Sequence, residues 1–198
     1  MKPWYVYLFD FLVGVFTKQN LGAAGAGPEA LRHSTTLAVP LPAFASNPTP
    51  PVGRAESRDL EHLHPELLIR YMALKADFAS RTGRTLFETC TWRSVDEQGR
   101  LFRRGRSGIP GEKKVTNCDG VTNKSRHNVF PSEAVDVCVD MDPGPGKHPV
   151  WDFEAYKPLG QLALIHGLRW GGDWNGNGSS ADERLIDYPH LELPAGAA

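Results

Sequence analysis

The spacing of apolar residues predicts one long helix near the start of the folded part of the chain. Leucine and aromatic side chains recur there at intervals of three and four, namely Leu67, Tyr71, Leu74 and Phe78. This spacing places them on one face of a helix. Pro65 suits the first turn and Gly83 the end. A stripe of this kind is typical of a surface that faces the core.

A strand and a short helix are predicted directly after this helix. Residues 85–92 are rich in β-branched and aromatic residues and read as a strand. Residues 94–97, Ser-Val-Asp-Glu, match a capping box, which predicts a helix that begins there. Arg93 is therefore fixed at a strand-to-helix junction, where side chains commonly reach into a cleft. The alternative is an exposed arginine that pairs with Asp96 or Glu97.

The segment 134–139 alternates Val135, Val137 and Val139 with Ala134, Asp136 and Cys138. Both faces of such a strand are mostly apolar, so we expect it to be buried. A buried carboxylate at Asp136 requires a cation or several donors, because an unpaired buried charge is very costly. A metal shared with His127 in the preceding loop would meet that requirement, and so would an arginine. This segment alone leaves both alternatives open.

The C-terminal segment 187–193 reads as a turn that enters a short strand. Pro189 suits the first residue of a strand. Leu191 and Leu193 then lie on one side, and His190 and Glu192 on the other. His190 is a candidate third metal ligand, with Asp187 just before it on the turn. The alternative is a single histidine at a strand edge.

A second helix is predicted over about 152–166, and a polar loop follows it. Trp170 and Trp174, which flank the start of this loop, either line a cleft or cover the core. The loop places oxygen side chains at its first, third and fifth positions and glycine at its sixth: Asp173, Asn175, Asn177 and Gly178. This is the opening of an EF-hand-type calcium loop. Arg184 stands where that loop has glutamate, so a plain turn is the alternative to calcium.

The N-terminal quarter of the chain differs in composition from the rest. Residues 4–16 are apolar but interrupted by Asp10, and they are shorter than the roughly 20 residues of a spanning helix. They are interpreted as a signal or weak membrane anchor, as an amphipathic packing segment, or as an uncleaved tail. Residues 18–56 are rich in proline, alanine and glycine and are predicted to be a flexible linker. The expected division is 1–17, 18–56 and a catalytic domain at 57–194.

Charge and cysteine usage exclude some classes of protein. Lys and Arg number 22 and Asp and Glu 23, a formal net charge of -1, which argues against a general nucleic-acid binder. The three cysteines form no CxxC pair, so a thiolate zinc knuckle is not expected. Residues 103–114 are locally basic. A solvated loop is the simplest interpretation, and attraction to a polyanionic cell-wall surface is the alternative.

Four separated pieces of the sequence together resemble the zinc peptidase family of D-alanyl-D-alanine carboxypeptidases and L-alanyl-D-glutamate endopeptidases, and most of all its phage endolysin branch. They are Thr-Trp-Arg-Ser at 91–94, the Ser-x-His to Ala-Val-Asp-Val segment at 125–137, Gly-Leu-Arg-Trp-Gly-Gly-Asp-Trp at 167–174, and Asp-x-Pro-His at 187–190. Their order and intervals agree with the family from about residue 59 to 193. The interval between His127 and Asp136 is longer than in the common form of the motif.

The resemblance implies a zinc site and an amide hydrolase. His127, Asp136 and His190 would be the zinc ligands, and Asp187 the catalytic acid and base. Arg93 would bind substrate and stabilise the transition state, with Ser125 and Trp170 as further substrate-binding residues. Two imidazoles and one carboxylate leave zinc an open position. Calcium at Asp173, Asn175 and Asn177 is a second, separate expectation.

These expectations define one function and one fold. We expect a zinc-dependent murein peptidase that hydrolyses L-Ala-D-Glu or D-Ala-D-Ala bonds in peptidoglycan stem peptides, with a role in cell-wall lysis. The alternative is a non-catalytic, zinc-stabilised module that binds the cell wall. The fold should be α+β, a small, mostly antiparallel sheet that carries the ligands and is packed with helices. The protein should be a monomer that acts at the cell wall or in the periplasm, reached by export or by release during lysis.

Overall fold

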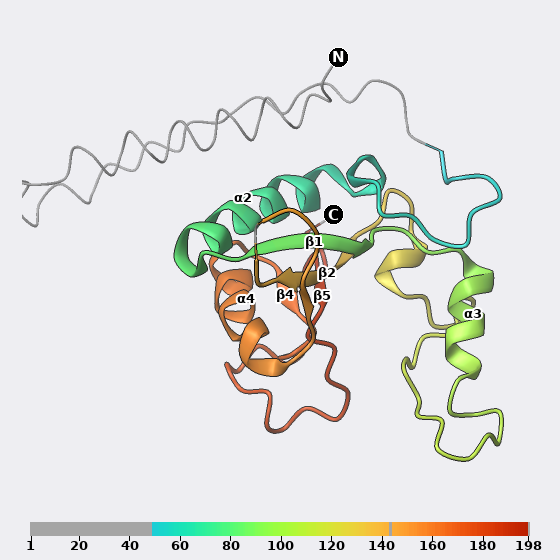
Figure 1. The fold of residues 1–198 in the computed structure, drawn as a ribbon. Coiled ribbons are helices and arrows are strands. Elements are labelled where there is room, and N and C mark those ends of the chain that lie inside the picture. Colours follow the sequence, from blue (N-terminus) through green and yellow to red (C-terminus); the bar gives the residue numbers. More distant parts are fainter. Residues whose placement is uncertain (1–48, 143, 198) are drawn as a thin grey trace, which may run out of the picture. The chain divides into compact units, whose positions relative to one another are not determined.

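A computed structural model of the chain describes residues 49–142 and 144–197 (Figure 1). They belong to one compact unit, Pro48–Ala198. The predictions made for the hydrophobic segment 4–16 and for most of the linker at 18–56 lie outside the described residues. Within the described part, no helix is both long enough and apolar enough to cross a membrane.

The helices begin and end at the residues that their capping signals indicate. The α-helices are α2 (Pro65–Thr82), α3 (Val95–Arg103) and α4 (Phe153–Ile165), with short 3-10 turns η2 (Leu60–His62) and η3 (Arg126–Asn128). The hydroxyl of Ser94 accepts the backbone N–H of Glu97 and caps α3. Gly83 ends α2 in the left-handed conformation, with φ of 68°.

One antiparallel sheet crosses the unit. Its strands are β1 (Thr85–Cys90), β2 (Ala134–Asp140), β3 (Pro149–Val150), β4 (Arg169–Trp170) and β5 (His190–Glu192). The order is β1-β2-β5-β4, and β3 pairs with the end of β2. The small antiparallel sheet and the three α-helices found within residues 49–142 and 144–197 confirm the expected α+β fold.

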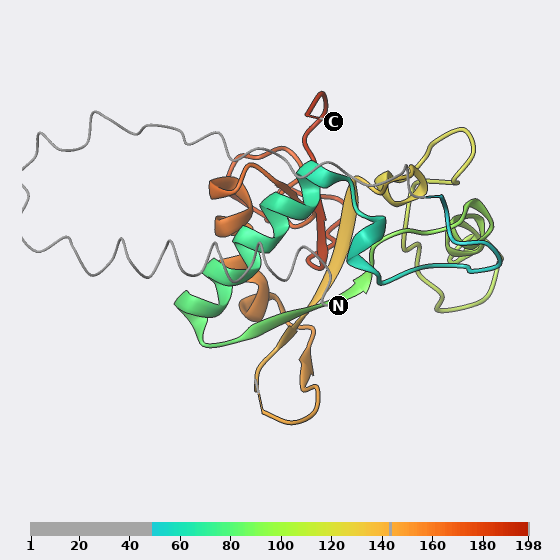
Figure 2. The same cartoon turned by 90° about the horizontal axis from the view of Figure 1, so that it is seen from above.

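The apolar stripe of α2 forms part of the core, as its spacing predicts. Helices α2 and α4 lie side by side against the sheet (Figures 1 and 2). Leu67, Tyr71, Leu74 and Phe78 are each 0% exposed. Burial of one such side chain stabilises the fold by about 1.5–3 kcal/mol. This packing holds the sheet in place beneath the site described below.

Residues 95–128 form a separate feature, which we call the lateral lobe. It comprises α3, a long loop and η3, and it stands away from α2 and α4 beyond the end of β1 (Figures 1 and 2). The side chain of Gln98 is 0% exposed and holds the lobe together. Its amide nitrogen donates to the hydroxyl of Thr116 and to the carbonyl of Cys118.

The strand register brings chemically active residues to one place. Asp136 on the central strand β2 lies directly opposite His190 on β5 and opposite Cys90 on β1. Residues directly opposite each other in an antiparallel pair have neighbouring side chains on the same face. The loop that carries His127 lies beside this point, because its backbone carbonyl accepts the N–H of Arg93.

Candidate metal centre

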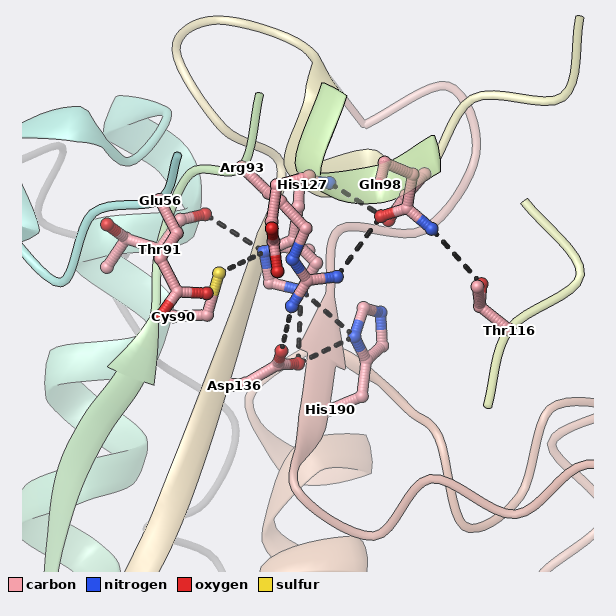
Figure 3. Close-up of polar contacts among 12 residues, drawn as sticks. Glu56, Cys90, Thr91, Arg93, Gln98, Thr116, His127, Asp136 and His190 are labelled. Carbon is pink, nitrogen blue, oxygen red and sulfur yellow. Dashed lines mark hydrogen bonds and ion pairs between the residues drawn. The ribbon is translucent and has the colours of Figure 1, made fainter. Parts of the chain in front are cut away.

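Two imidazoles and one carboxylate converge at the register point (Figure 3). His127 Nε2 and His190 Nδ1 each lie 3.0 Å from the same oxygen, Oδ1 of Asp136. The two ring nitrogens are 3.3 Å apart. Both imidazoles are buried, with 1% and 5% exposure. The three predicted ligands, distant in sequence, therefore meet at one point.

The outer hydrogen bonds of the two rings determine which nitrogens are free. His127 Nδ1 lies 3.0 Å from the carbonyl oxygen of Thr91, and His190 Nε2 lies 3.0 Å from a carboxylate oxygen of Glu192. Both partners are acceptors, so these outer nitrogens carry the protons in the neutral rings. The inner nitrogens then carry lone pairs, and these point toward each other and toward the Asp136 carboxylate. Three acceptors at this distance require a cation between them.

The spacing of these atoms fits a tetrahedral metal. Zinc binds imidazole nitrogen at about 2.0–2.1 Å, and the edge of such a tetrahedron is about 3.3 Å. The separation of His127 Nε2 and His190 Nδ1 is 3.3 Å. Outer hydrogen bonds to a carbonyl or carboxylate are also the usual support of metal-binding histidines. The donor set therefore suits a divalent ion such as zinc.

Arg93 holds the second oxygen of the same carboxylate. Its guanidinium donates to Asp136 Oδ2 at 3.1 Å and to the side-chain oxygen of Gln98 at 3.1 Å. The arginine pairing considered for Asp136 thus exists alongside the histidine contacts. Because Arg93 occupies Oδ2, Oδ1 is left to face the imidazoles. Gln98 in turn joins the lateral lobe to this arginine (Figure 3).

Burial and charge shift the acid-base behaviour of the centre strongly. Burial lowers the pKa of His127, but the charge and hydrogen bond of Asp136 outweigh it and raise that pKa to about 10. Burial raises the pKa of Asp136, and the charges of His127 and His190 bring it well below the usual value. The three side chains therefore retain a proton between them. A metal cation would take the place of this proton.

Asp187 lies beside the centre and faces the same cleft. Oxygen atoms of Asp136 and Asp187 and a ring nitrogen of His190 lie within 4.8 Å of one another. Burial and the charge of Asp136 raise the pKa of Asp187. A cleft of about 410 Å³ is lined by Arg93, His127, Asp136, Asp187 and His190, with the lateral lobe as its other wall. The centre is therefore reachable by a substrate.

The structure separates the two candidate substrate-binding residues. Ser125 lines the cleft, and its hydroxyl accepts the backbone N–H of His127, so it also orients the ligand loop. Trp170 does not line the cleft. It is 8% exposed, donates to the carbonyl of Tyr188 and fills the space above Gly160 and Gly172, where a Cβ would approach its ring within 2.3–2.4 Å. Trp174 is the tryptophan of this pair that lines the cleft, and substrate binding by Trp170 stays a prediction from sequence.

The calcium-like loop is closed by its own hydrogen bonds. The two carboxylate oxygens of Asp173 accept the backbone N–H groups of Asn177 and Gly178. The side-chain oxygen of Asn175 also accepts the Asn177 N–H. Asp182 accepts the amide groups of both asparagines. These are the contacts of an Asx turn, so calcium at Asp173, Asn175 and Asn177 stays a prediction from sequence.

Three residues of the site are not identified as functional from sequence. The carboxylate of Glu192 accepts hydrogen bonds from His190 Nε2 and from the Arg169 guanidinium, both at 3.0 Å. The others are Gln98 and Cys90, and the sulfur of Cys90 lies 3.8 Å from His127 Nδ1. Cys90 is a free, buried thiol. The alternation that places Glu192 on the side of His190 was a usable signal, but nothing local identifies Gln98.

Comparisons with known proteins give a distant structural likeness. No protein-family model matches the sequence, and no curated protein matches it. Among solved structures, the chain is similar to the L-Ala D-Glu endopeptidase ChiX of Serratia marcescens, with 21% sequence identity and a TM-score of 0.46. The match covers 71% of this chain and 86% of that chain. At this distance the likeness decides nothing about the reaction, for which the residues of the site must be considered.

Proposed function

We propose that this protein is a zinc-dependent peptidase that hydrolyses amide bonds in peptidoglycan stem peptides. His127, Asp136 and His190 would hold the metal. The observation that carries the proposal is the meeting of His127 Nε2, His190 Nδ1 and Asp136 Oδ1 within 3.3 Å, at the wall of a cleft that also contains Asp187. The substrate class comes from the resemblance of the four sequence pieces to the murein peptidases.

The residues of the cleft have distinct parts in such a reaction. A zinc ion, when bound, supplies a Lewis acid that polarises the scissile carbonyl and acidifies water. The Asp187 carboxylate takes a proton from the attacking water and returns it to the leaving amine nitrogen. Its raised pKa favours the protonated state that the second transfer needs. The Arg93 guanidinium, which also lines the cleft, counters negative charge that develops on the substrate.

Digestion of purified murein followed by mass spectrometry tests the proposal. The zinc-loaded protein should release fragments with new amino and carboxyl ends, and the masses identify the bond that is cut. Removal of zinc by a chelator should abolish release, and zinc should restore it. Metal binding without any release of amines would instead support the non-catalytic wall-binding module.

A matched pair of variants tests the part assigned to Asp187. Asp187→Ala should retain zinc and lose about 10²–10⁴-fold in rate, the usual contribution of general acid-base catalysis. Asp96→Asn, an exposed acid on α3, should retain the full rate. Hydrolysis by zinc-loaded Asp187→Ala at the wild-type rate would show that the mechanism is wrong.

A further inference from the structure

The positive charge of this protein is concentrated in and next to the lateral lobe. Residues 100–126 carry eight Lys or Arg and two Asp or Glu, a formal charge of +6. The whole chain carries 22 and 23 of these residues, so the other 171 residues carry a formal charge of -7. The near-neutral net charge of the chain is therefore the sum of a positively charged segment and a negatively charged remainder. Such an asymmetry creates a local field that attracts polyanions.

Most of these cations have no acidic partner among the described residues. Within the described residues, no carboxylate lies within 4.0 Å of Arg103, Arg106, Lys113, Lys114 or Lys124. Lys113, Lys114 and Lys124 are exposed. By contrast, Arg81 on α2 and Lys157 on α4 are paired with acids on their own helices.

The loop that carries the cations is ordered by its own contacts. Glu112 accepts the backbone N–H of Gly105 at 2.9 Å and the hydroxyl of Ser107 at 2.7 Å. Gly105 has φ of +66°, and a Cβ there would come within 2.2 Å of the Lys114 backbone nitrogen. The two ends of the loop therefore cross closely at a glycine. Fixed cations lose less conformational entropy on binding than cations on a flexible tail.

The charged surface continues into the candidate cleft. Arg104, Lys124 and Arg126 belong to the lateral lobe and line the cleft that contains Asp187 and His190. A polymer lying on the lobe would thus have its nearest segment at the catalytic groups. This continuity favours the substrate polymer as the partner over an unrelated polyanion.

We propose that the lateral lobe is a docking surface for the anionic polymers of the cell wall. The inference rests on the proposed function, because it takes the polymer to be the carrier of the substrate. The partner is peptidoglycan itself, and the feature recognised is the set of closely spaced carboxylates on its stem peptides. Docking would hold the enzyme on an insoluble substrate between successive cleavages.

Cosedimentation with purified sacculi tests the surface with the full chain. Binding of wild-type protein should fall steeply between about 50 and 500 mM NaCl, since screening shortens the reach of exposed charges. The double variant Lys113→Ala/Lys114→Ala should bind about tenfold more weakly at low salt, as expected for the loss of two cations that face a polyanion. The control Arg81→Ala/Lys157→Ala removes the same charge elsewhere and should bind like wild type. Equal losses in the two double variants, or none in either, would overturn the proposal.

Further experiments identify the polymer that is bound and test the docking surface independently of the peptidase. Sacculi stripped of phosphate polymers by hydrofluoric acid should retain binding, because the stem-peptide carboxylates remain. Loss of binding after this treatment would overturn the proposal and indicate a phosphate polymer as the partner. Double-stranded DNA that binds as tightly as both kinds of sacculi would overturn the commitment to the cell wall. Salt-dependent binding by wild type without release of amines from a soluble stem peptide would leave the docking surface standing and refute the peptidase. Release of amines, together with equal binding of sacculi by the two double variants, would support the peptidase and refute the docking surface.

Discussion

Glu192 supports one of the candidate ligands without facing the metal position itself. It receives Nε2 of His190 and is held in turn by Arg169. Glu192→Gln keeps the size of the side chain but removes its charge. We expect zinc affinity to fall about 10–100-fold, the usual effect of losing such a partner. Competition with a chelator of known affinity measures this.

An exposed glutamate provides the control for that experiment. Glu154 pairs with Lys157 on the surface of α4, and Glu154→Gln should leave zinc affinity unchanged. Equal affinities of Glu192→Gln and wild type would show that His190 is oriented by other contacts.

Gln98 is predicted to be a positioning residue for Arg93. Gln98→Leu removes the acceptor of the guanidinium and both donors to the lobe, whereas Gln98→Glu keeps the acceptor. We expect Gln98→Leu to lower kcat about tenfold with zinc content unchanged, because a buried hydrogen bond to a charged group contributes about 1.5–3 kcal/mol. Gln98→Glu should retain most of kcat although the lobe is less stable. A loss of kcat that follows Tm equally in both variants would indicate a purely structural residue.

The sequence predicts the role of a residue where a strong local pattern surrounds it. It does not predict which residues that are distant in sequence will contact each other. A carboxylate inside an apolar strand requires a cation or several donors. This requirement identifies Asp136 as a candidate ligand from the sequence alone. Gln98 shows no such conflict on a short polar helix, so only the fold reveals that it is fully buried against Arg93. Trp170 and Trp174 are four residues apart, and close packing of Trp170 against Gly160 leaves Trp174 to line the cleft.

At the scale of elements, the turn between β4 and β5 is predicted to position two site residues. Gly171 accepts the backbone N–H of Asp187 and donates to the carbonyl of His190. A Cβ at Gly171 would lie 2.3 Å from the Asp187 carbonyl oxygen and 3.0 Å from the His190 Cβ. Gly171→Ala should therefore displace this turn, with at least a tenfold loss of activity and weaker zinc binding.

Gly99→Ala is the matched control for this change. A Cβ there would have the Asp119 carbonyl oxygen as its nearest neighbour outside α3, at 3.8 Å, and alanine favours a helix by about 0.5–1 kcal/mol over glycine. It should be active and slightly more stable. Full activity of Gly171→Ala would show that the turn adapts without moving Asp187 or His190.

The elements with regular periodicity were predictable, and the irregular ones were not. The stripe and caps of α2, the start of α3 at the N-cap Ser94 and the alternation of β2 each agree with the structure. Only half of the expected capping box forms at α3, because the Glu97 carboxylate accepts from Arg100 and the Ser94 N–H donates to the Ala55 carbonyl. The wall of the cleft formed by the long loop of the lateral lobe has no periodicity. Its course depends on contacts such as Gln98 to the Cys118 carbonyl, which join residues far apart in sequence. A local pattern cannot specify such contacts.

For the whole molecule, protons and metal should compete at the centre. The pKa of His127 in the metal-free fold is raised to about 10, above its unfolded value of about 6.5. Protonation therefore contributes stability fully below about pH 6.5, and this contribution is lost as the pH rises toward 10. Zinc must displace the proton, so stabilisation by zinc should grow over the same interval.

Thermal unfolding between pH 6 and pH 9, with and without zinc, measures this competition. The Tm of the metal-free protein should fall as the pH rises, and the increase in Tm caused by zinc should become larger. His127→Gln should show neither trend. An increase in Tm that is independent of pH would contradict the involvement of His127 in metal binding.

The central claim is that one divalent ion is shared by three side chains distant in sequence. Anomalous diffraction at the zinc edge from crystals of the zinc-loaded protein tests it most directly. We predict one strong peak about 2.0–2.2 Å from His127 Nε2, His190 Nδ1 and a carboxylate oxygen of Asp136. A zinc-loaded crystal with no peak between these atoms, or with its ordered zinc bound elsewhere, would contradict the account.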